Sequence, residues 1–126
     1  MTVTSNTKLT IHFNDPVLEP EEKDQQVQWL IADLNDMDEI ESVNRVLDLN
    51  PPDRSKSFRN FLAGLLMVEV NTGNAKKKLL PFLGNRLGGT PIELSVEFNG
   101  KKLTVTAQSR EELEVAVKAI QDFIEV

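Results

Sequence analysis

Hydrophobic and polar residues alternate over residues 8–13, where Leu9, Ile11 and Phe13 share one side and polar residues the other. A period of two is typical of a half-buried strand, because successive side chains of a strand point to opposite faces. The alternation stops at Asn14-Asp15-Pro16. We therefore expect the first strand to end at Phe13.

The next segment, 20–34, has the pattern of an amphipathic helix. Pro20 and the two glutamates after it favour a helix start, since proline is tolerated in the first turn and acidic side chains suit the positive end of the helix dipole. The apolar positions have the i, i+3, i+4, i+7 spacing that places one stripe against a core. These positions are Val27, Leu30, Ile31 and Leu34, and Trp29 lies beside them.

A second strand is predicted over 43–49, which is rich in aliphatic residues and stops at Asn50-Pro51-Pro52. Proline cannot donate to a strand ladder, so the strand cannot continue through this stop. The order strand, helix, strand favours a parallel, right-handed crossover between the first two strands.

The middle of the chain is the most ambiguous part. Ser57 is suited to cap a helix that begins at Phe58. The apolar residues of this helix over 58–66 would lie on one face. The run 65–70 is also compatible with a strand, and periodicity cannot separate the two over so short a window. We predict a helix here. A further helix is expected over 75–87, kinked or broken near Pro81, which crowds the carbonyl four residues before it.

Residues 92–98 and 101–107 both alternate, and Asn99-Gly100 lies between them. Both turn residues tolerate the positive φ of a type I′ turn, so the pattern predicts a tight hairpin. Its register would place Val96 opposite Leu103 and Glu97 opposite Lys102. Ser109 and Glu112 then form a capping box, in which the glutamate would bond the Ser109 amide, and a helix should follow to the chain end.

These elements predict a single α+β domain over 1–126, with residues 1–7 as a flexible extension. The expected order is β-α-β-α-α-β-β-α. We expect a four-stranded mixed sheet with helices mainly on one face.

Composition and charge limit the kinds of partner and the cellular compartment that we expect for this chain. The 126 residues carry a net charge of −6, which disfavours nucleic-acid or anionic-membrane affinity, and no stretch has the length of a membrane span. Cysteine is absent and the first residues lack a signal-peptide pattern, so we expect a cytoplasmic protein. Residues 15–41 hold ten acidic side chains against one lysine. This segment is either a solvated acidic surface or a charge-complementary docking surface.

Candidate chemistry is sparse. His12 is the only histidine, and a zinc site or a histidine-based triad would need partners that are hard to find here. The acids at 33–41 lack the glycine and distal glutamate of a calcium loop, and no P-loop motif is present. The exposed hairpin face has no aromatic residue for stacking RNA bases. We therefore expect no catalytic residue, no metal and no cofactor.

A surplus of large apolar residues remains, and a residual apolar patch on a small domain marks a protein contact. The candidate partner-binding anchors are Trp29, Phe61, Leu65, Leu66 and Phe82. The alternative function is a small anion- or nucleic-acid-binding module. It would use Lys76, Lys77, Lys78 and Arg86 near a helix start.

Two blocks of the chain resemble the effector-associated constant component, a small domain family of predicted bacterial conflict systems. The first block is the strand and helix with Val27-Gln28-Trp29-Leu30, followed by acids and Val43 to Val46; the second is the terminal hairpin and helix. The lysine run and Pro81 depart from the family pattern. The resemblance implies a non-enzymatic adaptor whose partner is another protein, such as an effector or an effector-associated-domain protein. A homodimer is also expected to be feasible, because a polar sheet face and an apolar surplus are both available for self-association.

Overall fold

The computed structural model describes residues 6–47 and 61–124. Its elements follow one another as β1 (Asn6–Phe13), α1 (Pro20–Asn35), β2 (Ile40–Leu47), β3 (Phe61–Asn71), α2 (Thr72–Asn74), the π-helical turn η1 (Ala75–Leu79), α3 (Leu80–Arg86), β4 (Ile92–Phe98), β5 (Lys101–Ala107) and α4 (Arg110–Phe123). The first strand therefore begins at Asn6, inside the extension expected over residues 1–7, while residues 1–5 lie outside the described part.

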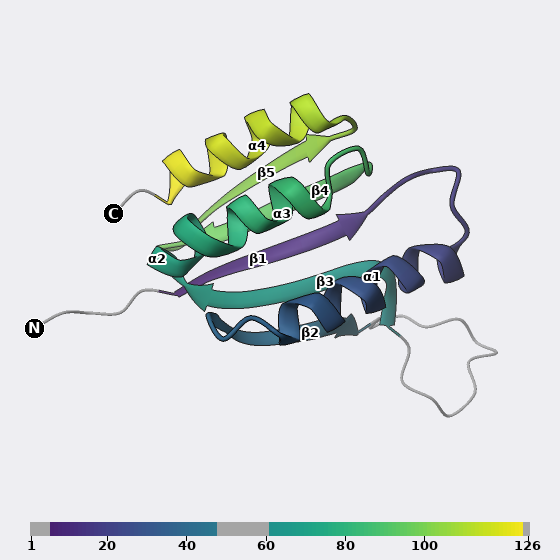
Figure 1. Cartoon of the computed structure of the whole chain (residues 1–126), viewed down its shortest axis with the longest axis horizontal. Coiled ribbons are helices and arrows are strands. Elements are labelled where there is room, and N and C mark those ends of the chain that lie inside the picture. The colour runs from purple at the N-terminus through teal and green to yellow at the C-terminus, as the bar shows by residue number, and fades with distance from the viewer. Residues whose placement is uncertain (1–5, 48–60, 125–126) are drawn as a thin grey trace, which may run out of the picture.

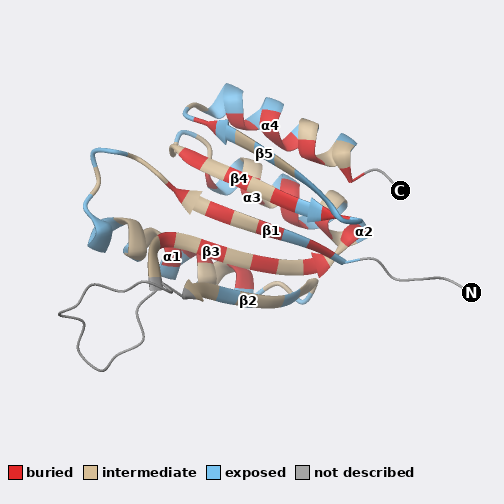
Figure 2. Cartoon of the chain, turned by 180° about the vertical axis from the view of Figure 1, so that it is seen from behind, coloured by how far each residue is buried: buried red, intermediate tan, exposed pale blue. Residues whose placement is uncertain are grey.

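The five strands form one sheet in the order β2-β3-β1-β4-β5, and every neighbouring pair is antiparallel. The helices lie on one face of this sheet, and the other face is open (Figures 1 and 2). The α+β class is confirmed. The prediction of a four-stranded mixed sheet is wrong, because the described residues form five strands, and no two neighbours among them are parallel.

The extra strand is β3, where the sequence predicted a helix. Leu66, Val68 and Val70 are buried toward the helices, whereas Leu65 and Met67 are half-buried on the open face. A strand between two others can be apolar on both faces, which makes its sequence resemble a helix with a wide apolar stripe. The part of the predicted helix before Phe61 lies outside the described residues.

β3 also alters the crossover between β1 and β2. Both strands are antiparallel to β3, so they run in the same direction, as expected. They are not neighbours, however, because β3 lies between them. The second strand begins at Ile40, three residues before its predicted start, and residues 48–49 lie outside the described part.

The helical run over 72–86 continues through Pro81 without a break. Its turn just before the proline is widened to a π-helix, in which the N–H of Leu80 donates to the carbonyl of Ala75 five residues earlier. A wider turn gives room to a proline ring that would otherwise clash with the preceding turn. The side-chain amide of Gln121 on α4 donates to the carbonyl of Lys76 at 3.0 Å, which ties this turn to the last helix.

The hairpin and its register are as predicted, with Val96 opposite Leu103 and Glu97 opposite Lys102. Asn99 and Gly100 both have positive φ, as a type I′ turn requires. Ser109 caps α4 by accepting a hydrogen bond from the Glu112 N–H at 3.1 Å. The reciprocal bond differs from the prediction, since the Glu112 carboxylate accepts the N–H of Gln108, one residue earlier.

One hydrophobic core lies between the sheet and the helices. Its largest fully buried side chains come from β1, α1, β3, α3 and β4, including Phe13, Leu30, Leu66, Leu83 and Leu94. On the open face, one cross-strand row alternates in charge: Glu69, Lys8, Glu97 and Lys102. Opposite charges in directly facing positions stabilise each other. Across the described ranges, no helix has the length and hydrophobicity to cross a membrane.

Candidate partner-binding notch

The five predicted anchors do not form one patch. Trp29 is 57% exposed on α1 and is the only described aromatic residue among the exposed large hydrophobic ones. Leu66 is fully buried in the core, so it offers no surface to a partner. Phe82 packs partly against the core, Leu65 is half-buried on the open face of the sheet, and Phe61 is the first residue of β3. Trp29 is thus the anchor to which a surface site can be built.

α1 presents two stripes with different roles. Its buried residues Val27, Leu30 and Leu34 pack on the sheet. A second stripe with the same spacing of i, i+3 and i+7 consists of Gln26, Trp29 and Asp33. Residues at this spacing share a helix face. This second stripe is directed toward α3, because Asp33 is bonded to Arg86 at the end of α3.

A small notch lies between the two helices. It has a volume of about 120 Å³, and its lining residues are Phe13, Gln26, Trp29, Arg86, Leu87 and Thr90. Phe13 and Leu87 are buried and provide an apolar floor. A space of this size fits one side chain of a partner rather than a drug-sized ligand, for which pockets are several times larger.

The side chain of Gln26 sets the chemistry of the notch. Its Oε1 atom is buried and finds no hydrogen-bond donor among the described residues. Buried polar atoms in folded proteins are nearly always bonded, so each exception calls for an explanation. Gln26 also lines the notch together with Trp29, so a rotation of its side-chain amide would bring this acceptor to a bound partner.

The rim of the notch is held by an ion pair. Arg86 Nε donates to Asp33 Oδ2 at 2.7 Å, and both side chains are substantially exposed. Exposed pairs stabilise a fold by at most about 1 kcal/mol. In this ion pair, Asp33 compensates the positive charge of Arg86. The sign of the electrostatic field around the notch is then set by the other acidic residues of α1.

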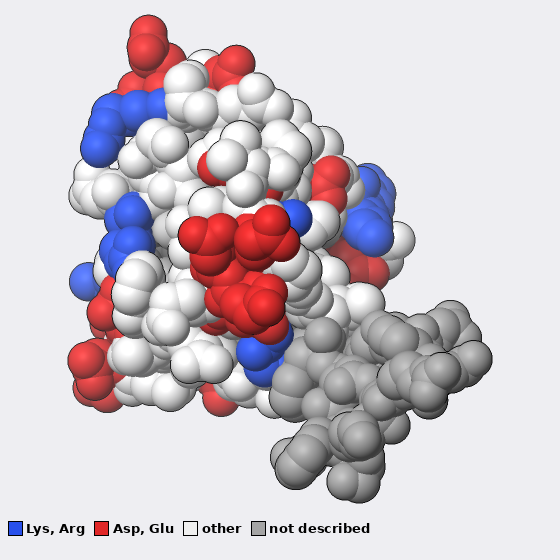
Figure 3. Space-filling model, turned by 90° about the vertical axis from the view of Figure 1, so that its right-hand side faces the viewer, with Lys and Arg blue, Asp and Glu red and all other residues white. Residues whose placement is uncertain are grey.

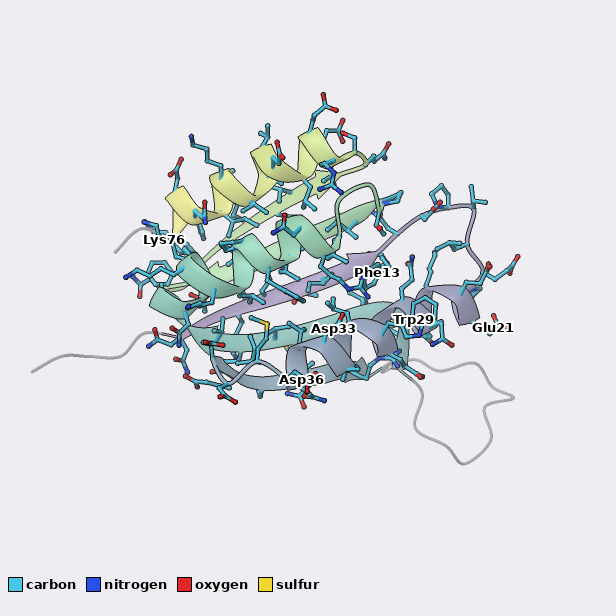
Figure 4. The ribbon with its side chains drawn as sticks, in the orientation of Figure 1. Phe13, Glu21, Trp29, Asp33, Asp36 and Lys76 are labelled. Atoms are coloured by element: carbon cyan, nitrogen blue, oxygen red, sulfur yellow. The ribbon has the colours of Figure 1, made fainter. Side chains whose placement is uncertain are left out.

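That field is negative. Glu21, Glu22 and Asp36 are exposed near the two ends of α1, and the last turn of the helix has no basic residue. Figure 4 shows Glu21, Trp29, Asp33 and Asp36 along the same helix. Acidic side chains gather on the end of the molecule where α1 begins (Figure 3). A cationic partner would be attracted to this region, and the attraction would weaken with added salt.

The residues of the anion-binding alternative are not brought together. Lys77 and Lys78 are exposed, but Lys76 to Arg86 spans ten residues of helix, or about 15 Å. Arg86 is paired with Asp33. The N–H groups of Gly73 and Asn74, which an anion would need, donate instead to the side chain of Asn71.

His12 lies on the open face of the sheet with its Nδ1 atom 3.9 Å from a carboxylate oxygen of Glu93. Both side chains are about one-third exposed. Within 6–47 and 61–124 no three His, Cys, Asp or Glu side chains are grouped as a metal site.

Sequence reasoning named Trp29 as an anchor and Arg86 only for the anion-binding alternative, and it did not place the two in one site. The signal within the chain was the second stripe of α1, Gln26 and Asp33, which has polar residues at core-like spacing. Leu87 and Thr90, and the position of Arg86 near Trp29, could not be found in this way, because only the packing of α3 beside α1 brings them there.

Comparisons with family models, with curated proteins and with solved structures found no significant match to this chain.

Proposed function

We propose that this chain is a non-catalytic protein-binding component that captures a basic side chain of a partner protein in the notch between α1 and α3. The observation that carries the proposal is that Gln26, whose buried Oε1 has no donor among the described residues, lines the same notch as the exposed Trp29. An arginine guanidinium fits both groups, since it donates hydrogen bonds in a plane and stacks on an aromatic ring.

The charge around the notch supports the same choice of partner. The acidic side chains of α1 attract a cation from a distance, which raises the association rate at low salt. Trp29 then acts as the anchor, because tryptophan is among the residues that dominate interface energies. The setting in a bacterial conflict system is part of the proposal and rests on the sequence resemblance alone.

The test compares three forms of the chain: wild type, Trp29→Ala, and Val17→Ala as a control at another exposed apolar residue. Each is immobilised and exposed to an extract of the native cell. We expect a partner that the wild type and the control retain and the Trp29 variant loses. The retained partner is then purified and titrated against the wild type, with Trp29 fluorescence as the signal, because Trp29 is the only tryptophan in the chain.

Two results are expected from the titration. The fluorescence changes on binding, and the affinity falls by about tenfold when the contacting arginine of the partner is replaced by alanine. Equal retention by all three forms, or a partner whose binding leaves Trp29 fluorescence unchanged, would rule out the notch as the binding site.

A further inference from the structure

The second surface of interest lies at the other end of the sheet, where β5 forms an edge under α4. A groove of about 450 Å³ runs between them. Its residues are Val105, Thr106, Glu111, Glu112, Val115, Ala116 and Ala119. Val115 is 70% exposed, although it belongs to the helix that covers the sheet.

The groove arises because the layer of helices is wider than the sheet beneath it. α1, α3 and α4 lie side by side on one face, and α4 runs along and beyond β5 in both views (Figures 1 and 2). Helices are about 10 Å wide and strands about 4.8 Å apart, so three helices cover about six strands. The sheet has five. The outer side of α4 therefore lacks a strand beneath it.

The backbone of β5 is ready to bond that strand. In a two-residue hairpin the residues flanking the turn, Phe98 and Lys101, exchange hydrogen bonds, and bonded pairs alternate from there. The N–H and C=O groups of Lys102, Thr104 and Thr106 consequently point away from β4, toward the edge along which no described strand lies. An edge with such groups is a template for another strand.

The two edges of the sheet differ in their protection. β2, the opposite edge, has register shifts between Ile40 and Ser42 and between Arg45 and Leu47. Such irregularities twist an edge strand and discourage pairing. β5 pairs with β4 in one uninterrupted register and contains no proline. The β5 edge is thus the one that can accept a strand.

We propose that β5 and α4 bind one extended segment of a second protein, which adds to the sheet as a sixth strand. Its alternate side chains are small and apolar and fill the groove against Val105 and Val115. A basic residue lies at the end near Glu111 and Glu112, and an acidic residue lies near Lys101 and Lys102. A second copy of β5 does not fit as the added strand, because the two-fold axis would bring its α4 onto the first.

This site is separate from the Trp29 notch, so one chain can hold two partners at once. Affinity at such a site comes from main-chain hydrogen bonds, and specificity comes from alternate side chains in the groove.

The test is a selection of displayed random peptides of about ten residues, the upper length of common strands. Peptides are selected for binding to the wild type. Peptides that also bind Val115→Glu are removed, because they bind outside the groove. We expect enriched peptides to alternate apolar and polar residues. Synthetic versions should bind Val115→Glu about tenfold more weakly, because the new carboxylate lies in an apolar groove. Val17→Glu, the same change at another exposed valine, should bind like the wild type.

Two further readouts locate the peptide. The amides of Thr104 and Thr106 should become protected from hydrogen exchange when the peptide binds. Thr104→Pro removes an outward N–H that β4 does not use, and it should weaken binding similarly. Trp29→Ala should leave binding unchanged, which separates this site from the notch.

Other outcomes would overturn the proposal. It would be overturned by selected peptides that bind Val115→Glu as tightly as they bind the wild type. Peptides whose apolar residues recur with the 3.6-residue period of a helix would also overturn it, as would peptides that leave the amides of Thr104 and Thr106 unprotected. A chain that is dimeric by light scattering, and becomes monomeric in Val115→Glu, would replace the partner strand with a second copy.

Discussion

At the scale of single residues, we expect Gln26 to have opposite effects on the stability of the fold and on partner binding. Its Oε1 atom is buried without a donor among the described residues, and an unsatisfied buried acceptor costs about 1 to 3 kcal/mol. Leucine is of comparable size and has no polar side-chain atom. A group retained at such a cost in the folded chain is consistent with a role in binding.

We predict that Gln26→Leu raises the free energy of unfolding by about 1 kcal/mol and weakens capture of the partner. Urea denaturation measures the first effect, and the titration described above measures the second. Gln28→Leu, an exposed position on the same helix, is the control and should change neither. A loss of stability in the Gln26 variant would mean that the oxygen is bonded in solution, for example to water.

Gly64 is required by the close packing of three elements. Its φ is +74°, and a Cβ built on it would lie 2.8 Å from the carbonyl oxygen of Phe13. Its N–H donates to Asp24 of α1, which also accepts a hydrogen bond from Arg45 of β2. The position thus joins α1, β2 and β3.

We expect Gly64→Ala to lower the free energy of unfolding by about 3 kcal/mol, because the strain of a positive φ adds to a backbone clash. Gly100→Ala serves as the matched control, since Gly100 also has a positive φ but nothing within 4 Å of its Cβ position. The control should lose about 1 kcal/mol. Equal losses in thermal or urea unfolding would show that the contact with Phe13 costs nothing.

At the scale of elements, the π-helical turn η1 is stabilised from outside the helix. The Leu80 N–H goes to Ala75, and Pro81 has no N–H to donate. Gln121 supplies a side-chain donor to the carbonyl of Lys76 from α4. The two helices are therefore coupled through this hydrogen bond.

We predict that Gln121→Ala lowers the free energy of unfolding by about 1 kcal/mol, the usual contribution of one hydrogen bond. The control is Gln108→Ala, because the hydrogen bond at that residue uses its backbone N–H and survives the change. Hydrogen exchange of the amides in η1 should also become faster in the Gln121 variant. Unchanged exchange would show that the turn holds without α4.

At the scale of the whole molecule, all the helices share one core on one sheet. The core cluster includes residues from β1 through α4, so no part of the described chain has a separate core. Cooperative unfolding is the usual behaviour of a domain of this size.

We therefore expect a single unfolding transition, with the same midpoint for Trp29 fluorescence, which reports on α1, and for far-ultraviolet circular dichroism, which reports on all helices. Urea titration followed by both signals checks this. Separate midpoints would show that the α1 side of the sheet and the hairpin with α4 unfold independently.

The two candidate sites differ in how far the sequence could predict them. The sequence predicted Trp29 as a candidate anchor, because a tryptophan beside an apolar stripe is visible in one helix. It could not identify the groove, since Val105 fits the pattern of a buried position in its strand, and Val115 is a single apolar residue outside the buried stripe of its helix. Only the tertiary structure shows that Val115, 70% exposed on α4, lies beside Val105 of the edge strand β5.

Local chemistry in the sequence determined the α+β class, the first strand, the helix over α1, the hairpin with its register, and the last helix. Each of these depends on neighbours within a few residues: an alternation, an i, i+4 stripe, an Asn-Gly turn or a serine cap. Tertiary structure decided the state of residues 61–71, the position of β3 between β1 and β2, and the notch beside Trp29. A segment that is apolar on both faces has no periodicity to separate helix from strand, so its conformation depends on the strands that pair with it.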